Sequence, residues 1–395
     1  MAAATSHLRR LLRRHFSSSP SSILNPSNPS TPLSSKEKSR AALSLLKSAS
    51  DPDHILSICR AASLSPSSSH LDRLALSLAV SKLSSSASPS SSSSSSQTLT
   101  LISPLLSSPS HLPHAIVLLG QAGLFDDAVA AFKASPSLRS FNSLLFAAIL
   151  ANRHADVSRL FRELPISHSI TPNLTSYNTI VKAFSESGSS RSVFSVLEEM
   201  SRSGIKPNKT TFCSALAGLY KEEKFDDVEK LLVLMRKHGC GPRLTAYNVR
   251  IQSLCKLKRS EEAKALLKEM AANGMKWNWV TYNHLIYGFC KEGNLEEAKR
   301  LYKEMRRRGF VGDSNLYFTY IYYLCQGGEF EEALGVCKVT MARNWVPCFS
   351  TMKVLVNGLA SSEKIEEARE IIEKMKEKFP GNADTWKEVE EGLAQ

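Results

Sequence analysis

The segments EEAKALLKEM (residues 261–270) and EEAKRLYKEM (residues 296–305) carry nearly the same ten letters, 35 residues apart. Four further sets of residues keep this step along the chain: one of alanines, one of methionines, one of aromatic residues and one of cysteines. They are Ala263, Ala298, Ala333 and Ala368; Met200, Met235, Met270 and Met305; Tyr177, Phe212, Tyr247, Tyr282 and Tyr317; and Cys255, Cys290 and Cys325. Because independent residue types share one period, the chain is a repeat array.

Each unit of the array has two amphipathic halves. Residues 280–293 (VTYNHLIYGFCKEG) place Tyr282, Leu285, Ile286 and Phe289 on one helical stripe, and residues 294–309 (NLEEAKRLYKEMRRRG) do the same with Leu295, Ala298, Leu301, Tyr302 and Met305. Gly293 and Gly309 end the two helices. Two antiparallel helices cannot bury both stripes alone, so neighbouring pairs must stack. We therefore expect an all-α fold, a right-handed α-solenoid of 35-residue helix–turn–helix units whose first helices line the concave face.

The composition excludes some partners and favours others. The chain has 395 residues, 42% of them hydrophobic, and a formal net charge of +13. No run approaches the roughly 20 apolar residues that a membrane-spanning helix needs. The excess of Lys and Arg favours a polyanionic partner or an acidic membrane surface.

The first residues differ from the rest of the chain. Arg9, Arg10, Arg13 and Arg14 lie among Leu, Ala and Ser, and no acidic residue precedes Glu37. An Arg-rich, acid-free amphipathic start is typical of an organelle transit peptide, and its arginine density favours the mitochondrial matrix over the chloroplast. We assign residues 1–16 to a mitochondrial transit peptide and residues 17–36 to a flexible linker. A disordered basic tail is the alternative.

Low-complexity segments divide the rest of the chain. A helical segment is expected at 37–83, where Asp51 or Asp53 caps a helix with Pro52 in its first turn. The Ser-rich stretch at 84–110 is expected to be a disordered loop. The solenoid covers 111–383 in about seven or eight units, with a helical cap at 384–395. The units are 112–137 (degenerate), 138–173, 174–208, 209–243, 244–278, 279–313, 314–348 and 349–383 (degenerate).

The unit resembles the pentatricopeptide repeat. The residues that carry the resemblance are Thr281-Tyr282-Asn283, which open a first helix, and Gly204-Ile205-Lys206-Pro207-Asn208, which close a unit. The resemblance covers about two thirds of the chain. It implies binding of single-stranded RNA, one base per repeat, with the fifth and last residue of each unit at the Watson–Crick edge.

Four units carry an informative pair of base-facing residues. The pairs are Asn142 with Asn173, Asn178 with Asn208, Asn248 with Asn278, and Asn283 with Asp313. By the family's rule the first three lean to pyrimidines and the last to uracil, whereas Cys213 with Arg243 and Phe318 with Cys348 match no known pairing. Asn also caps helices commonly, so these residues alternatively have only a structural role.

The family's second-position clamp is largely missing. That position usually holds an aliphatic residue that sandwiches the base, and here only Val280 fits; the other units have Arg139, Thr175, Thr210, Thr245, Asn315 and Ser350. Since base stacking contributes roughly 1–3 kcal/mol per base in single-strand binders, we expect weak sequence readout.

A row of lysines is the expected backbone contact. Lys221, Lys256 and Lys291 are again 35 residues apart, at the turn between the two helices of successive units. In the family a Lys at this place contacts phosphate, and such contacts are strongly salt-dependent. The alternative is a row of solvated turn lysines.

No catalytic motif is present. The chain has no H-x-E paired with C-x-x-C, no H-E-x-x-H, no phosphate-binding G-x-x-x-x-G-K-[ST] and no G-x-S-x-G. The eight cysteines are expected to be small core residues of separate repeats in a reducing compartment. We therefore expect a binder that is not an enzyme, with no cofactor, no metal and no small-molecule substrate.

Three stretches narrow the resemblance further. Residues 33–64, 246–256 and 345–360 are similar to segments of short plant mitochondrial pentatricopeptide proteins associated with the small ribosomal subunit. This resemblance implies rRNA and mitochondrial ribosomal proteins as partners and a role in translation. A free organellar factor acting on one mRNA and a protein–protein scaffold are the alternatives.

Overall fold

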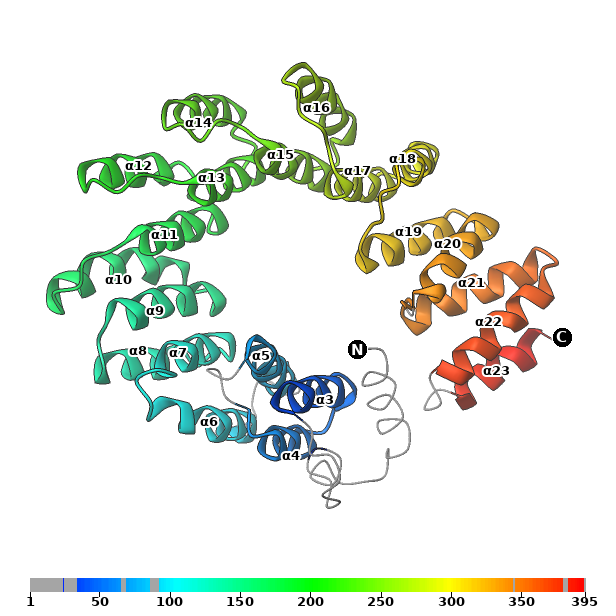
Figure 1. Cartoon of the computed structure of the whole chain (residues 1–395), viewed down its shortest axis with the longest axis horizontal. Coiled ribbons are helices and arrows are strands. Elements are labelled where there is room, and N and C mark those ends of the chain that lie inside the picture. The colour runs from blue at the N-terminus through cyan, green and yellow to red at the C-terminus, as the bar shows by residue number, and fades with distance from the viewer. Residues whose placement is uncertain are drawn as a thin grey trace. The chain divides into compact units, whose positions relative to one another are not determined.

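The computed structural model describes residues 24, 34–64, 69–85, 92–343, 345–378 and 383–393. Over these ranges the chain forms 21 helices, α3 to α23, and no strand (Figure 1). The chain divides into two compact units, Met1–Pro207 and Asn208–Gln395, which are described separately. The predicted transit peptide, nearly all of the predicted linker and residues 86–91 of the Ser-rich stretch lie outside the described residues.

The first unit contains ten of the described helices. They are α3 (Ser35–Ser48), α4 (Pro52–Ala62), α5 (His70–Ser85), α6 (Ser92–Leu106), α7 (Leu112–Gln121), α8 (Phe125–Ala134), α9 (Leu138–Leu150), α10 (His154–Ser167), α11 (Leu174–Glu186) and α12 (Ser192–Arg202). From α7 onward these helices alternate as first and second helices of successive repeats.

The second unit continues the alternation. Its helices are α13 (Lys209–Lys221), α14 (Phe225–Lys237), α15 (Leu244–Lys256), α16 (Ser260–Ala272), α17 (Trp279–Lys291), α18 (Leu295–Arg307), α19 (Ser314–Gln326), α20 (Phe330–Ala342), α21 (Phe349–Ser361), α22 (Ile365–Lys378) and α23 (Ala383–Leu393). The first helices from α13 to α21 start 35 residues apart, so the predicted all-α stack of helix pairs is confirmed.

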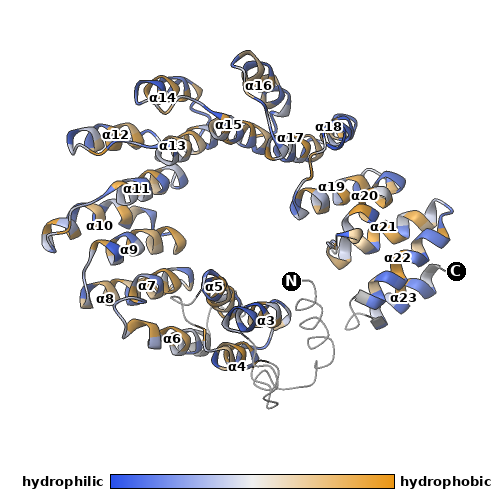
Figure 2. Cartoon of the chain, viewed as in Figure 1, coloured by the Kyte–Doolittle hydropathy of each residue, from blue (hydrophilic) through white to orange (hydrophobic). Residues whose placement is uncertain are grey.

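The two helices of a pair have different surroundings. First helix α17 buries Tyr282, Leu285, Ile286 and Phe289 as the spacing predicted. Second helix α18 is mostly hydrophilic, as Figure 2 shows, and buries only Ala298, Leu301, Tyr302 and Met305. The first helices therefore form the core of the stack, and the second helices cover one side of it.

A side-chain hydrogen bond ties the two helices of several pairs together. The tyrosine in the first turn of the first helix donates to a glutamate 22 residues later, in Tyr177–Glu199 (3.1 Å), Tyr247–Glu269 (2.7 Å) and Tyr282–Glu304 (3.0 Å). The repeats of α13 and α19 are among those that lack this bond. Phe212 has no hydroxyl. In the repeat of Tyr317 the residue 22 positions later is Val339 and not a glutamate, and the buried Tyr317 hydroxyl has no partner among the described residues.

Small residues let consecutive repeats approach closely. Ala263, Ala298, Ala333 and Ala368 are all fully buried. A Cβ added at Gly288 of α17 would lie 2.6 Å from Cys255 Sγ and 2.4 Å from Ser260 Oγ, both of the preceding repeat. A side chain at this position is excluded, so α15 and α17 pack at a distance that only glycine permits.

The Ser-rich stretch is more ordered than its composition predicted. Residues 92–106 form helix α6, whereas a disordered loop was expected throughout 84–110. Thr98, Ile102 and Leu105 lie on one side of α6 and are buried, and Gln97 donates a hydrogen bond to Asp53 of α4 (3.2 Å). The disordered loop was expected because a run of serines cannot bury apolar surface, but the amphipathic segment that follows the serines supplies a buried face.

Candidate nucleic-acid interface

A groove lies between successive first helices. Between α13 and α15 it has a volume of about 520 Å³ and is lined by Lys209, Thr210, Cys213, Ser214, Ala217, Thr245 and Val249. Cys213 occupies the fifth position of its repeat, and Thr210 and Thr245 occupy second positions. The groove therefore brings together the positions that the sequence assigned to base contact and to the clamp.

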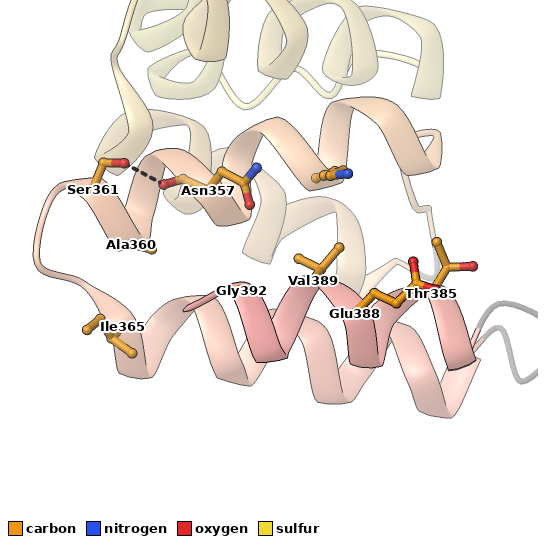
Figure 3. A pocket seen from close by; sticks show the side chains of 9 residues that line it. Asn357, Ala360, Ser361, Ile365, Thr385, Glu388, Val389 and Gly392 are labelled. Carbon is orange, nitrogen blue, oxygen red and sulfur yellow. Dashed lines mark hydrogen bonds between the residues drawn. The ribbon is translucent and has the colours of Figure 1, made fainter. Parts of the chain in front are cut away.

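An equivalent groove of about 510 Å³ lies between α21 and α23, near the end of the array (Figure 3). Lys353 in the fifth position and Asn357 in the ninth position of the last repeat line one side, and Thr385, Glu388 and Val389 of α23 line the other. In Figure 3 the Val389 side chain points from α23 toward α21. Because the same repeat positions line two separate grooves, the groove is a feature of the repeat itself.

The last residue of each informative unit caps the helix that follows. Asn173, Asn208, Asn278 and Asp313 are the N-caps of α11, α13, α17 and α19, and each accepts a hydrogen bond from a main-chain amide in the first turn. The capping role that the sequence left open is thus present. It uses the carbonyl or carboxylate oxygen of each cap, because a helix start offers only donors.

The paired asparagines contact each other within two repeats. Asn142 Nδ2 donates to Asn173 Oδ1 at 3.3 Å, and Ser176 Oγ donates to Asn142 Oδ1 at 2.6 Å. In the same arrangement Asn248 Nδ2 lies 3.5 Å from Asn278 Oδ1, and Thr281 Oγ1 donates to Asn248 Oδ1 at 2.8 Å. The amide oxygens are therefore engaged inside the protein, and the Nδ2 groups of Asn142 and Asn248 are directed at the cap of the next unit.

Asn283 and Asp313 differ from those pairs. Asn283 Oδ1 is buried and has no hydrogen-bond partner among the described residues, while Asp313 accepts from the Leu316 amide at 2.9 Å. The cause is local, because Leu316 stands where the other repeats have Ser176 or Thr281 and has no hydroxyl to donate. The amide oxygen of Asn283 is therefore buried without the hydroxyl that pairs with Asn142 and Asn248, and Asp313 supplies the carboxylate of this repeat.

The remaining informative pair is divided between the two units. Asn178 lies on α11 of the first unit, and Asn208 begins the second unit as the cap of α13. Val280, the one aliphatic residue at a second position, is half-buried in the first turn of α17.

The three predicted lysines end consecutive first helices. Lys221, Lys256 and Lys291 are the last residues of α13, α15 and α17. Lys221 and Lys256 are exposed and Lys291 is half-buried. Lys291 Nζ donates to the main-chain carbonyl of Lys256 at 3.3 Å, so neighbouring members of the row lie close together.

The ninth position of the repeat was missed by the sequence analysis. Ala217 and Asn357 line the two grooves from this position. Counting in 35-residue steps from them reaches Tyr287 of α17 and Tyr322 of α19, which are both exposed. The signal was available in the sequence, because both tyrosines keep the repeat period.

The cysteines of the 35-residue series are core residues, as predicted. Cys255, Cys290 and Cys325 are buried, and burial raises the pKa of each thiol to about 12. Cys348 differs, since it is exposed as the N-cap of α21. Over the described ranges no group of three or more His, Cys, Asp or Glu residues is placed to hold a metal ion, and no helix there has the length and apolarity of a membrane span.

Family models match the repeat region. The model described as PPR repeat matches residues 210–240, 280–310 and 350–378, and the model described as PPR repeat family matches 172–221 and 242–291. A mitochondrial pentatricopeptide repeat-containing protein of Arabidopsis thaliana is 50% identical over 366 residues, which cover 91% of this chain and 90% of that protein.

Two further relatives and one solved structure are more distant. The small ribosomal subunit proteins mS78 and mS79 of Arabidopsis thaliana are 36% and 31% identical over 25% and 26% of this chain, and over 27% and 28% of their own lengths. Maize PPR10 in complex with an 18-nt psaJ RNA element superposes with a TM-score of 0.50 at 18% identity, over 94% of this chain. The chain spans 57% of that PPR10 chain, and the likeness shows the fold alone.

Proposed function

Because this chain belongs to the pentatricopeptide repeat family, we propose that it binds single-stranded RNA in the grooves between its first helices. The observation that carries this proposal is the groove between α13 and α15, where the fifth and second positions of the repeat meet beside Lys209. A groove lined by polar groups and bordered by cations suits a flexible polyanion whose bases enter the repeat one at a time.

Hydrogen-bond chemistry supports a preference among bases in three repeats. Asn142 with Asn173 and Asn248 with Asn278 offer amide N–H donors, and these suit the O2 and N3 acceptors of cytosine or the carbonyl oxygens of uracil. Asp313 supplies a carboxylate acceptor, which suits the N3–H of uracil. The preference is narrow, because Cys213 and Phe318 occupy the fifth position of two other repeats.

Backbone contact supplies most of the affinity in this proposal. Lys221, Lys256 and Lys291 neutralise phosphates along one edge of the first helices, and the net charge of +13 attracts RNA from a distance. Val280 supplies the one aliphatic base clamp. The protein is a binder without a catalytic step.

The site of action is the mitochondrion, where the RNA partner is rRNA of the small ribosomal subunit. The Arg-rich start of the chain and the mitochondrial relative support the compartment. Similarity to mS78 and mS79, together with the scarcity of base clamps, supports a ribosomal protein that grips structured RNA through its backbone and supports translation beside mitochondrial ribosomal proteins.

A second candidate is a free mitochondrial factor that stabilises or processes one transcript. The ordered amide networks of Asn142 and Asn248 favour it, because they fix the orientation of groups that read a base. Selection of preferred RNA sequences separates the candidates: a sharp consensus supports the free factor, and its absence supports the ribosomal protein. The third hypothesis, a protein–protein scaffold, predicts that the purified chain does not bind RNA.

Sedimentation of a mitochondrial lysate tests the ribosomal assignment. With magnesium and after EDTA, which separates the subunits, we expect stoichiometric co-migration with the small subunit. Migration near the top of the gradient under both conditions overturns the ribosomal assignment and leaves the single-transcript factor, which RNA retention on the purified chain then supports or rejects.

A further inference from the structure

Three aromatic side chains follow the RNA-facing register on α17 and α19. Tyr287 and Tyr322 hold the ninth position of consecutive repeats, and Phe318 holds a fifth position where other repeats have Asn. Tyr287 is 38% exposed and Tyr322 is 45% exposed. Large exposed rings at one repeated position are unusual on the surface of a solenoid, because its exposed positions are mostly polar.

The ring of Tyr287 lies on the same stripe as two groups already assigned to RNA. Asn283, Tyr287 and Lys291 follow one another at four-residue steps on α17, so they project from one side of the helix. This stripe joins a base-facing amide, an aromatic ring and a cation. A positively charged groove with stacking platforms is the usual arrangement in proteins that bind single strands.

Side chains at the ninth position meet between neighbouring first helices. In the first unit, Lys182 Nζ of α11 lies 5.0 Å above the ring of Phe146 of α9, and both hold this position. In the second unit, Tyr323 follows Tyr322 on α19. Its ring meets Tyr322 edge-on at 5.2 Å, and burial, followed by the nearby Tyr287, raises the pKa of Tyr323.

We propose that Tyr287 and Tyr322, with Phe318 beside them, form a stacking platform for two successive unpaired bases of the bound RNA. This platform does the work of the second-position clamps that the chain mostly lacks. It also gives a role to Phe318, which cannot hydrogen-bond a base. In the groove between α13 and α15 the corresponding residue is Ala217, so that groove is open where α17 and α19 offer rings. The inference rests on the proposed RNA binding and assigns the strongest base stacking to α17 and α19.

A thermodynamic cycle between protein rings and RNA bases tests the platform. The full chain is titrated with a fluorescent 14-nucleotide oligouridine and with the same oligomer carrying two adjacent abasic nucleotides at each possible place. Variants are Tyr287→Ala/Tyr322→Ala, Tyr287→Phe/Tyr322→Phe, and Ile166→Ala/Val233→Ala as a control for exposed apolar residues on second helices.

We expect the double alanine variant to bind the intact oligomer at least about tenfold more weakly, the phenylalanine variant to bind within about twofold of the wild type, and the control to be unchanged. The salt dependence stays the same in all three, because no phosphate contact is lost. The abasic change that most weakens the wild type has little further effect on the alanine variant, since both remove the same stacking.

If the wild type binds the oligomer and the alanine variant binds it with the same affinity, the platform is overturned and the proposed function stands. The same conclusion follows if the alanine variant keeps RNA but loses co-sedimentation with the ribosome, because the rings then dock a protein. Absence of RNA binding by the wild type rejects the proposed function and the platform together. Circular dichroism of each variant confirms that the helices are retained.

Discussion

The Lys291 ammonium group donates a hydrogen bond to the main-chain carbonyl of Lys256, at 3.3 Å, across the boundary between two repeats. That carbonyl belongs to the last residue of α15, and the carbonyls at the end of a helix have no N–H donor within the helix. One lysine thus completes the end of the preceding first helix and at the same time extends the row of positive charge. A purely solvated turn lysine would make no such contact, so the spacing between Lys256 and Lys291 has a structural basis.

The close packing at Gly288 predicts that a side chain at this position lowers the stability of the fold. Gly288→Ala places a Cβ 2.4 Å from Ser260 Oγ, so we expect the free energy of unfolding to fall by about 1–3 kcal/mol. Gly335→Ala is the matched control, because a Cβ there meets nothing within 4 Å and alanine favours helix by up to about 1 kcal/mol. Urea denaturation of both variants measures the difference. Equal effects would show that α15 and α17 do not approach as closely as described.

Tyr282 and Tyr317 occupy the same repeat position in opposite situations. Tyr282→Phe removes the hydrogen bond donated to Glu304 and the one accepted from Trp277 Nε1, and it should lower the free energy of unfolding by about 1–2 kcal/mol. Tyr317→Phe removes a buried hydroxyl without a partner among the described residues and should raise that free energy by about 1 kcal/mol or leave it unchanged. A loss of stability in Tyr317→Phe equal to that in Tyr282→Phe contradicts the assignment. Parallel denaturation of the two variants decides it.

His284 predicts how stability depends on pH. Burial, and after it the charge of Lys256, lowers the pKa of His284 to about 4 in the folded chain, whereas an unfolded histidine titrates near 6.5. The unfolded state therefore binds a proton first as the pH falls, and stability is lost from about pH 6.5 toward pH 4. His284→Gln should flatten this decline in thermal melts recorded between pH 7.5 and 5. The exposed His54→Gln should keep it, and an unchanged decline in His284→Gln would reject the explanation.

The exposed Cys348 should be the first thiol to react. Hydrogen bonds from Ser350 and Thr351 lower the pKa of Cys348 to about 7, whereas burial holds Cys255, Cys290 and Cys325 near 12. We expect iodoacetamide to alkylate Cys348 with half its maximal rate near pH 7, and the buried thiols only after unfolding. Peptide mass spectrometry across a pH series measures the rates. Alkylation of Cys255 in the folded chain at the same rate would contradict the packing.

The period of 35 residues was sufficient to predict the stack of helix pairs, because each unit repeats the same apolar stripes and the same glycine or asparagine at its boundaries. It did not predict α6, whose buried face depends on neighbours outside the Ser-rich stretch. The residues proposed to contact bases were identifiable by register, but the hydrogen bonds of their amide groups were not. Those hydrogen bonds depend on whether Ser176, Thr281 or Leu316 stands in the next repeat, which is a contact between units.

RNA retention by the lysine row tests the central claim most directly. The full chain and the variant Lys221→Gln/Lys256→Gln/Lys291→Gln are titrated with labelled oligouridine over a series of KCl concentrations. If each lysine contacts one phosphate, the slope of log affinity against log salt falls by about 2 in the variant, since each contact with a single strand contributes roughly 0.7. Wild-type binding with an unchanged slope in the variant would contradict the phosphate contacts, and failure of the wild type to bind would contradict RNA binding itself.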